Sequence, residues 1–169
     1  MLTNQQLFTT GAKYGAIAAA SGFLWTCFEF AIGLHDKYVE LHPYLTNLFF
    51  VIAIAITIFS LNEIKRLNGS LNVMLALKLG LVVGLVNLPL SLLSFYVFIE
   101  YVNPNMFTSF IQHMADYYIK TGKSVEEASK LATDYFNRES YFTQIAVGGV
   151  IGPVIMSVIA GFFMRTKSK

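Results

Sequence analysis

The most regular feature of the chain is a set of four long apolar segments separated by polar stretches. They cover residues 13–34, 44–62, 74–99 and 142–164. Each is close to the roughly 20 residues that an α-helix needs to cross about 30 Å of hydrocarbon. The pattern predicts an all-α, polytopic membrane protein with four transmembrane helices, in which residues 1–169 form a single membrane domain.

The segment between the third and fourth apolar stretches, residues 103–140, is too polar to cross a membrane but has helical periodicity. Apolar residues repeat at amphipathic spacing from Phe107 to Tyr118. Ser124 followed by Glu127 is a capping-box pattern that begins a second helix. We therefore expect a helical hairpin outside the cytoplasm. Its apolar sides can lie in the headgroup region, cover the end of the bundle or bind a partner, and amphipathicity does not choose among these places.

Small and polar residues form stripes on three of the predicted spans. Such stripes predict contact faces, because small residues let helix backbones approach closely in lipid. They are Gly11, Gly15, Ala18, Gly22, Thr26, Glu29 and Gly33 in the first span, Gly80, Gly84, Asn87, Ser91 and Ser94 in the third, and Gly149, Pro153, Ser157 and Gly161 in the fourth. The G-x-x-x-G pattern adds Gly148 and Gly152. The glycines expected to pack helices are Gly15, Gly22, Gly80, Gly84, Gly148 and Gly152.

Glu29 is a carboxylate inside an apolar run. An ionised acid at the centre of a span costs about 3 kcal/mol on insertion scales. We expect Glu29 to point into the bundle, at a height shared by a polar layer that forms a candidate intramembrane site. Its members are Glu29, Asn47, Asn87, Ser91 and Ser94. The layer is either a structural network, in which each polar group has a hydrogen-bond partner, or a site that handles protons or a ligand.

Two prolines lie inside predicted spans. Pro89 and Pro153 each remove a backbone donor and leave the carbonyl four residues earlier, at Leu85 and Gly149, without its helical partner. We expect both spans to kink.

Composition supports a lipid environment. Of 169 residues, 55% are hydrophobic and 13% are charged, which is too apolar for an ordinary water-soluble domain. The lipid bilayer is thus the first partner. The net charge of +2 is too small, and too scattered, to predict a nucleic-acid partner.

The distribution of basic residues predicts the orientation. Near span ends they gather on the side of the two termini and the 62–72 turn, as Lys13, Lys65, Arg66, Lys78, Arg165, Lys167 and Lys169. Because basic residues stay inside, both termini should face the cytoplasm.

The histidines, acids and nucleophilic residues match no known catalytic or metal-binding motif. The three histidines, His35, His42 and His113, fall on the outer side with several acids. Only His113 and Asp116 have one-turn spacing, and no zinc-binding framework is present, so we expect no metal and no cofactor. Catalytic and nucleotide-binding signatures are also missing from the sequence. The sequence thus predicts no enzyme.

Three stretches carry a resemblance to a family. "KYGAIAAASG" in the first span, "IKRLNGSLNVMLALKLGLVVGL" leading into the third, and "NPNMF" followed by "SVEEASK" in the outer segment are similar to an uncharacterised family of small four-span membrane proteins. That family is common in Bacteroidota and is classed as a domain of unknown function. The resemblance implies a bacterial inner-membrane location and no established activity.

Two functions follow as alternatives. The first is a non-enzymatic accessory or assembly component of envelope proteins, which binds a membrane-protein partner or a second copy of the chain. The second is a small oligomeric transporter or channel with a polar path around Glu29. A water-filled cavity that reaches Glu29 would favour transport.

Overall fold

The computed structural model describes residues 2–166, and every regular element in this range is a helix. In chain order the elements are α1 (Asn4–Ala31), η1 (Val39–Leu41), α2 (His42–Leu45), η2 (Thr46–Leu48), α3 (Phe49–Asn68), α4 (Val73–Val97), the π-helical turn η3 (Phe98–Val102), α5 (Met106–Lys120), α6 (Val125–Tyr135) and α7 (Arg138–Met164). The prediction of an all-α fold is confirmed.

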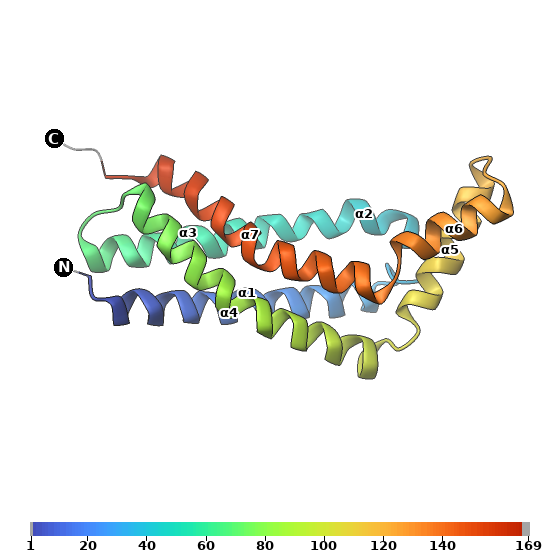
Figure 1. The fold of residues 1–169 in the computed structure, drawn as a ribbon, viewed down its shortest axis with the longest axis horizontal. Helices are drawn as coiled ribbons and strands as arrows, with labels where there is room; N and C mark the ends of the chain where they lie inside the picture. The colour runs from blue at the N-terminus through green and yellow to red at the C-terminus, as the bar shows by residue number, and fades with distance from the viewer. Residues whose placement is uncertain (1, 167–169) are drawn as a thin grey trace.

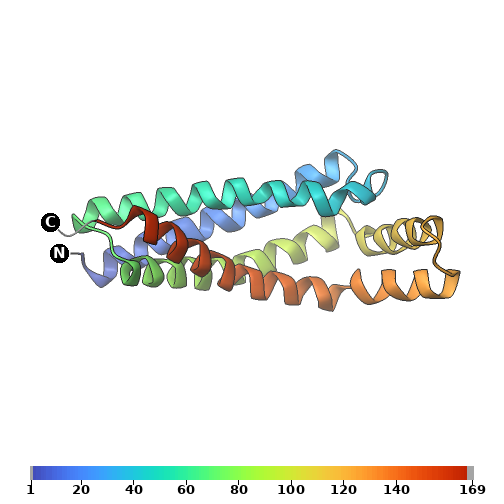
Figure 2. The same ribbon diagram turned by 90° about the horizontal axis from the view of Figure 1, so that it is seen from above.

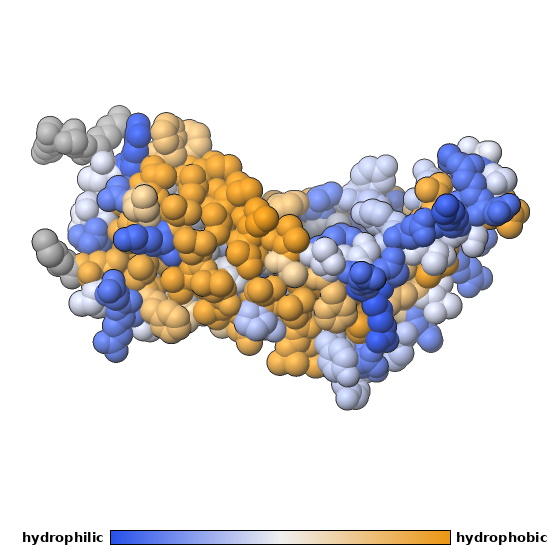
Figure 3. All heavy atoms as spheres, in the orientation of Figure 1, coloured by the Kyte–Doolittle hydropathy of each residue, from blue (hydrophilic) through white to orange (hydrophobic). Residues whose placement is uncertain are grey.

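Three helical stretches are long and apolar enough to cross a membrane. They are Val39–Asn68, Val73–Val102 and Arg138–Met164, and they contain the predicted segments 44–62, 74–99 and 142–164. α1 has 28 residues. It is not among the helices of residues 2–166 that are both long and apolar enough to cross a membrane. Figure 3 shows apolar side chains over much of the bundle and hydrophilic ones over the end formed by α5 and α6. These features are consistent with the predicted membrane protein.

The four long helices lie lengthwise beside one another (Figures 1 and 2). α4 packs most extensively on α7 and α1, whereas α3 makes less contact with α1 and α7. α1 begins and α7 ends at the end of the bundle where α3 connects to α4 (Figure 1). There the Thr166 N–H donates to the Leu71 carbonyl at 2.8 Å, and the Leu71 N–H donates to the Thr166 hydroxyl at 2.9 Å.

Glycines set the closest helix contacts. A Cβ on Gly15 would lie 2.7 Å from the Val83 carbonyl oxygen of α4, and one on Gly80 would lie 2.9 Å from the Pro153 carbonyl oxygen of α7. Gly84 approaches the backbone of Val150 equally closely. Side chains at these positions would push backbones apart, so α1, α4 and α7 form the tightly packed part of the bundle.

The other three glycines predicted to pack helices do not lie close to the backbone of another helix. Gly22 meets only the ring of Phe49 of α3, with 3.8 Å between the Phe49 Cζ and a Cβ built on the glycine. Gly148 faces open space, and Gly152 has only Met156 of its own helix nearby. The face of α7 that packs closely against α4 is instead its stripe of small residues from Gly149 to Gly161.

Asn87 joins α4 to α7 by a polar contact. Its Nδ2 atom donates a hydrogen bond of 3.1 Å to the carbonyl oxygen of Gly149. This is the carbonyl that Pro153, four residues later, leaves without a helical donor. The amide of Asn87 therefore supplies the hydrogen bond that the proline removes.

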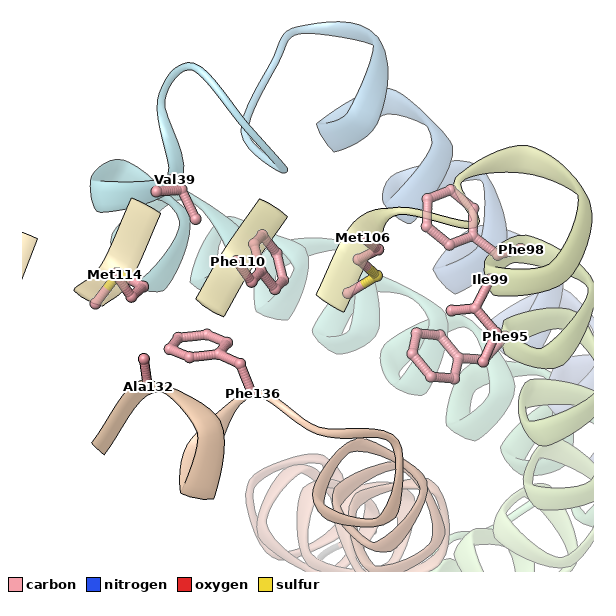
Figure 4. Packing of buried hydrophobic residues seen from close by; sticks show 9 residues of the cluster. All are labelled: Val39, Phe95, Phe98, Ile99, Met106, Phe110, Met114, Ala132 and Phe136. Carbon is pink, nitrogen blue, oxygen red and sulfur yellow. The ribbon is translucent and has the colours of Figure 1, made fainter. Parts of the chain in front are cut away.

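The amphipathic faces of α5 and α6 pack inward, over the end of α4 (Figure 4). Phe110 of α5 and Phe136, just after α6, turn toward each other with ring centroids 5.3 Å apart. We call this buried cluster the roof; it consists of Val39, Phe95, Phe98, Ile99, Met106, Phe110, Met114, Ala132 and Phe136. Ser124 caps the start of α6 as predicted, because its hydroxyl accepts the Glu127 N–H, but the Glu127 carboxylate accepts from Lys123 Nζ, so only half of the capping box forms. Of the three places left open for the apolar sides, the structure has them covering the end of the bundle.

Candidate functional site

Glu29 lies near the end of α1 and is 3% exposed. One of its carboxylate oxygens, Oε1, accepts a hydrogen bond of 2.7 Å from the indole N–H of Trp25, one turn earlier on the helix. That bond fixes the orientation of the carboxylate. The other oxygen, Oε2, faces the turn that follows α1.

Gly33 reverses the chain directly after Glu29. It adopts a φ of +81°, which glycine reaches without the clash that a Cβ creates. The Gly33 N–H donates to the Phe30 carbonyl at 3.0 Å, and the Leu34 N–H donates to the Glu29 carbonyl at 2.9 Å. This pair of bonds is the Schellman motif. It ends α1 and brings His35 back beside Glu29.

Two histidines converge on the free oxygen of Glu29. His35 Nε2 lies 3.7 Å from Oε2, and His42 Nε2, from the first turn of α2, lies 3.8 Å from the same atom. Both separations exceed the length of an N–H···O hydrogen bond. One ligand atom from each of the three residues lies within 4.8 Å of the others.

His35 is the most deeply enclosed member of the cluster. Its side chain is 1% exposed, and its Nε2 atom has no hydrogen-bond partner within residues 2–166. Its other nitrogen, Nδ1, lies 3.5 Å from the amide nitrogen of Asn103, which is itself buried. A buried imidazole nitrogen without a hydrogen-bond partner is costly to the folded state.

Side chains of the roof cover the cluster of Glu29, His35 and His42. The His35 ring packs edge-on against Phe98 and Phe110, with centroids 5.5 and 5.3 Å away, and the His42 ring lies 5.0 Å from Phe110. The side chain of His42 retains 14% exposure. Glu29 and His35 are thus screened from solvent, and His42 lies at the edge of the cluster.

The remaining members of the predicted polar layer lie apart from this cluster. Asn47 is exposed and its amide donates to the Pro43 carbonyl at 2.6 Å. Ser91 donates to Asn87 Oδ1 at 3.0 Å, and Ser94 donates to the Ser91 carbonyl at 3.1 Å. The structure therefore separates two polar groups: an α4–α7 network centred on Asn87, and the Glu29 cluster.

The sequence grouped His35 and His42 with His113 on the outer side but did not connect them with Glu29. Their spacing from Glu29 fits no helical periodicity, and only the turn at Gly33 and the return of the chain in α2 bring them together. The available signal was weak: two histidines flank "DKYVEL" directly after a span with a buried acid.

The comparison with protein families matches residues 13–166 to the family described as protein of unknown function, DUF4199. The chain belongs to this family. The match covers most of α1 and all of α3, α4, α7 and the α5–α6 pair, so the DUF4199 region includes Glu29, His35 and His42. The prediction of a domain of unknown function is confirmed. Comparisons with curated proteins and with solved structures each found no match.

The chemistry available to this DUF4199 cluster is acid–base or ligand binding. A carboxylate oxygen and two imidazole nitrogens can share protons or hold a metal ion. Two surface hollows lie away from the cluster, one lined by residues such as Asn4, Leu75 and Lys78 and the other by residues such as Gln5, Thr9 and Glu63.

Proposed function

We propose that this protein is a four-span inner-membrane protein that acts without catalysis, as an accessory or assembly component for other proteins of the bacterial envelope. The observation that carries this proposal is the closure of the bundle above Glu29. A polar path through the bundle would need Glu29 to reach water, but the roof and His35 enclose it, and its exposure is 3%.

The proposal includes α1 as the fourth span. At 1.5 Å per residue its 28 residues extend about 42 Å, longer than the hydrocarbon layer. It lies beside α4 along the bundle, and large apolar side chains such as Phe8, Leu24 and Phe28 remain exposed on it. Lipid or another protein would cover these side chains.

The proposed orientation places both termini in the cytoplasm and α5–α6 outside. Lys13, Lys65 and Arg66 lie toward the end where α1 begins and α3 ends. This agrees with the tendency of basic residues to remain on the cytoplasmic side. At the other end basic and acidic residues mix, as in the ion pair between Arg138 and Glu100 at 2.7 Å.

Thiol labelling in intact cells tests whether α4 crosses the membrane in the proposed orientation. With Cys27 replaced by alanine, a cysteine at the exposed Lys123 should react with a membrane-impermeant maleimide. A cysteine at the exposed Ser70 should react only after the cells are broken. Labelling of both, or of neither, in intact cells would contradict the proposed topology.

α3 offers the surface proposed for a membrane-protein partner or a second copy of the chain. It makes less contact with the bundle than α4 does, and it exposes Phe50, Val51, Ile54 and Phe59. In lipid, helix association depends on shape and packing, because lipid tails are as apolar as the side chains. A helix with few contacts inside the bundle therefore has surface available for packing against another protein.

Gentle-detergent purification followed by mass spectrometry tests this role. A partner or a dimer should accompany the wild-type protein and be lost when Phe50, Ile54 and Phe59 are changed to alanine. The matched control changes Ile151, Ile155 and Ile159, which are equally exposed on α7, and should retain the partner. Equal loss in both variants, or no enriched protein and no dimer in the wild type, would refute the proposal.

The alternative is a small oligomeric transporter or channel that uses Glu29. The observation in its favour is the partial exposure of His42 beside Glu29, which offers proton-carrying groups near the outer end. Proton flux into vesicles that contain the purified protein, abolished by Glu29→Gln, would support transport over the accessory role.

A further inference from the structure

We propose that Glu29, His35 and His42 form a binding site for a divalent transition-metal ion, with zinc as the ion to be tested. This inference goes beyond the accessory role, because a metal site is compatible with any function of the bundle. It depends on the positions of three ligand atoms, on the partners that orient them and on an unpaired buried nitrogen.

The ligand set suits zinc. Zinc in proteins is bound by imidazole nitrogens and carboxylate oxygens, and sites with two histidines and one glutamate are well known. Imidazole also favours divalent copper and nickel, whereas calcium and magnesium prefer sites built only of oxygen. The Glu29 cluster offers one oxygen and two nitrogens from residues that are at least partly buried.

The spacing of the ligand atoms is slightly wider than a bound ion requires. With bonds of about 2.0–2.2 Å, the ligand atoms of a tetrahedral zinc site lie about 3.3–3.5 Å apart. Here Glu29 Oε2 lies 3.7 Å from one histidine nitrogen and 3.8 Å from the other. Small side-chain rotations bring the three atoms to bonding distance, and the fourth position remains for water.

Two of the three proposed ligands, Glu29 and His35, have neighbouring polar groups that can orient them. Metal ligands are usually held by a second hydrogen bond that orients them. Trp25 holds Glu29 Oε1 at 2.7 Å, and Oε2 faces the two histidines. The structure has the amide nitrogen of Asn103 facing Nδ1 of His35 at 3.5 Å. An amide turned by about 180° would place its oxygen there instead and accept the Nδ1 proton. Nε2 of His35 then presents its lone pair to the ion.

The unpaired His35 nitrogen is the independent observation. Its Nε2 atom is buried, lacks a hydrogen-bond partner within residues 2–166, and lies among the other two ligand atoms. A network built only to satisfy Glu29 would place an N–H within hydrogen-bonding distance of Oε2. Separations of 3.7 and 3.8 Å are too long for hydrogen bonds, but an ion bonded to both atoms of a pair could bridge them.

Zinc binding to the purified full-length protein tests the inference. The protein is purified in mild detergent with an affinity tag that contains no histidine, and is treated with a chelator. Zinc is then titrated by calorimetry, and cobalt is used as a spectroscopic probe of tetrahedral coordination. We expect one zinc ion per chain and intense cobalt absorption in the visible range.

The variants separate this site from surface binding. His42→Gln and Glu29→Gln should weaken zinc binding by about tenfold or more. His113→Gln is the matched control, because His113 lies on α5 with Nδ1 2.8 Å from the Ser109 carbonyl, and it should bind as the wild type does. Helicity by circular dichroism and a single gel-filtration peak establish that each variant is folded.

A measurement on the wild-type protein tests the site without any substitution. Zinc should protect His42 from modification by diethyl pyrocarbonate, as mapped by mass spectrometry, without protecting His113. Absence of stoichiometric zinc binding by the wild type would overturn the inference. So would equal loss of binding in the His42 and His113 variants, or zinc protection that does not distinguish the two histidines.

Discussion

The Asn87 amide donates its hydrogen bond to the Gly149 carbonyl, the group that Pro153 deprives of a helical donor. An unpaired carbonyl in a membrane-spanning bundle is costly. The hydrogen bond from Asn87 therefore contributes to the packing of α4 against α7.

The Asn87–Gly149 bond predicts a specific coupling with Pro153. Asn87→Leu should lower the free energy of unfolding by about 0.6–2 kcal/mol, the range for hydrogen bonds between membrane helices. In a Pro153→Ala background the helix regains its own donor, so the same change should cost less. Unfolding of the four proteins in mixed micelles gives the coupling energy. Strictly additive losses would show that Asn87 acts independently of the proline.

Close packing at Gly80 predicts that even a methyl group is too large there. A Cβ would lie 2.8 Å from the Ser157 Cβ and 2.9 Å from the Pro153 carbonyl oxygen, so Gly80→Ala should destabilise the bundle by about 1–3 kcal/mol through overpacking. Gly148→Ala is the matched control, because Gly148 faces open space. It should be neutral or stabilise the helix by about 0.5–1 kcal/mol. Thermal unfolding in detergent measures both, and equal effects would contradict the close approach.

The turn at Gly33 predicts a combined loss of stability and zinc affinity. At a φ of +81°, Gly33→Ala should cost about 1 kcal/mol or more of folding free energy. It should also weaken zinc binding, because the turn positions His35. Gly69→Ala introduces the same backbone strain at a φ of +76°, with no atoms nearby, and should reduce stability without changing zinc affinity. A Gly33 variant with wild-type zinc affinity would show that the turn does not position the ligand.

The hydrogen bond from Trp25 predicts a role in orienting Glu29. Trp25→Phe keeps an aromatic ring but removes the N–H, so zinc binding should weaken by about tenfold, as when other metal ligands lose their orienting partner. Phe28→Leu is the control, since Phe28 contacts the Trp25 ring and is 51% exposed, and it should leave the affinity unchanged. Competition with a coloured zinc indicator measures both. Unchanged affinity in Trp25→Phe would remove the orienting role.

The helical character of the fold was predictable because it depends on composition. Long apolar runs form helices in lipid, where every backbone group needs an internal partner. The start of α1 was not predictable from hydropathy, since polar residues extend the helix back to Asn4. There the Thr3 hydroxyl accepts the Gln6 N–H, and the Gln6 side chain accepts the Thr3 N–H.

The finer contacts depend on helix rotation, which the sequence leaves open. Adjacent positions on a helix point about 100° apart, so the choice between Gly148 and Gly149 as a contact needs the orientation of α7. The Glu29 cluster is a similar case. Burial of Glu29 followed from its stripe of small residues, but its meeting with His35 and His42 depends on the reversal at Gly33 and on the path of the chain into α2.

The order of the roof and the cluster along the chain has a consequence for biogenesis. Glu29, His35 and His42 are synthesised before α3 and α4, whereas Phe98 and Phe110, which cover them, come afterwards. A nascent chain therefore exposes all three ligands until the later helices insert. The ligands of the proposed site therefore come together before the side chains that cover them, and in the mature protein an ion would reach them at His42, whose side chain retains 14% exposure.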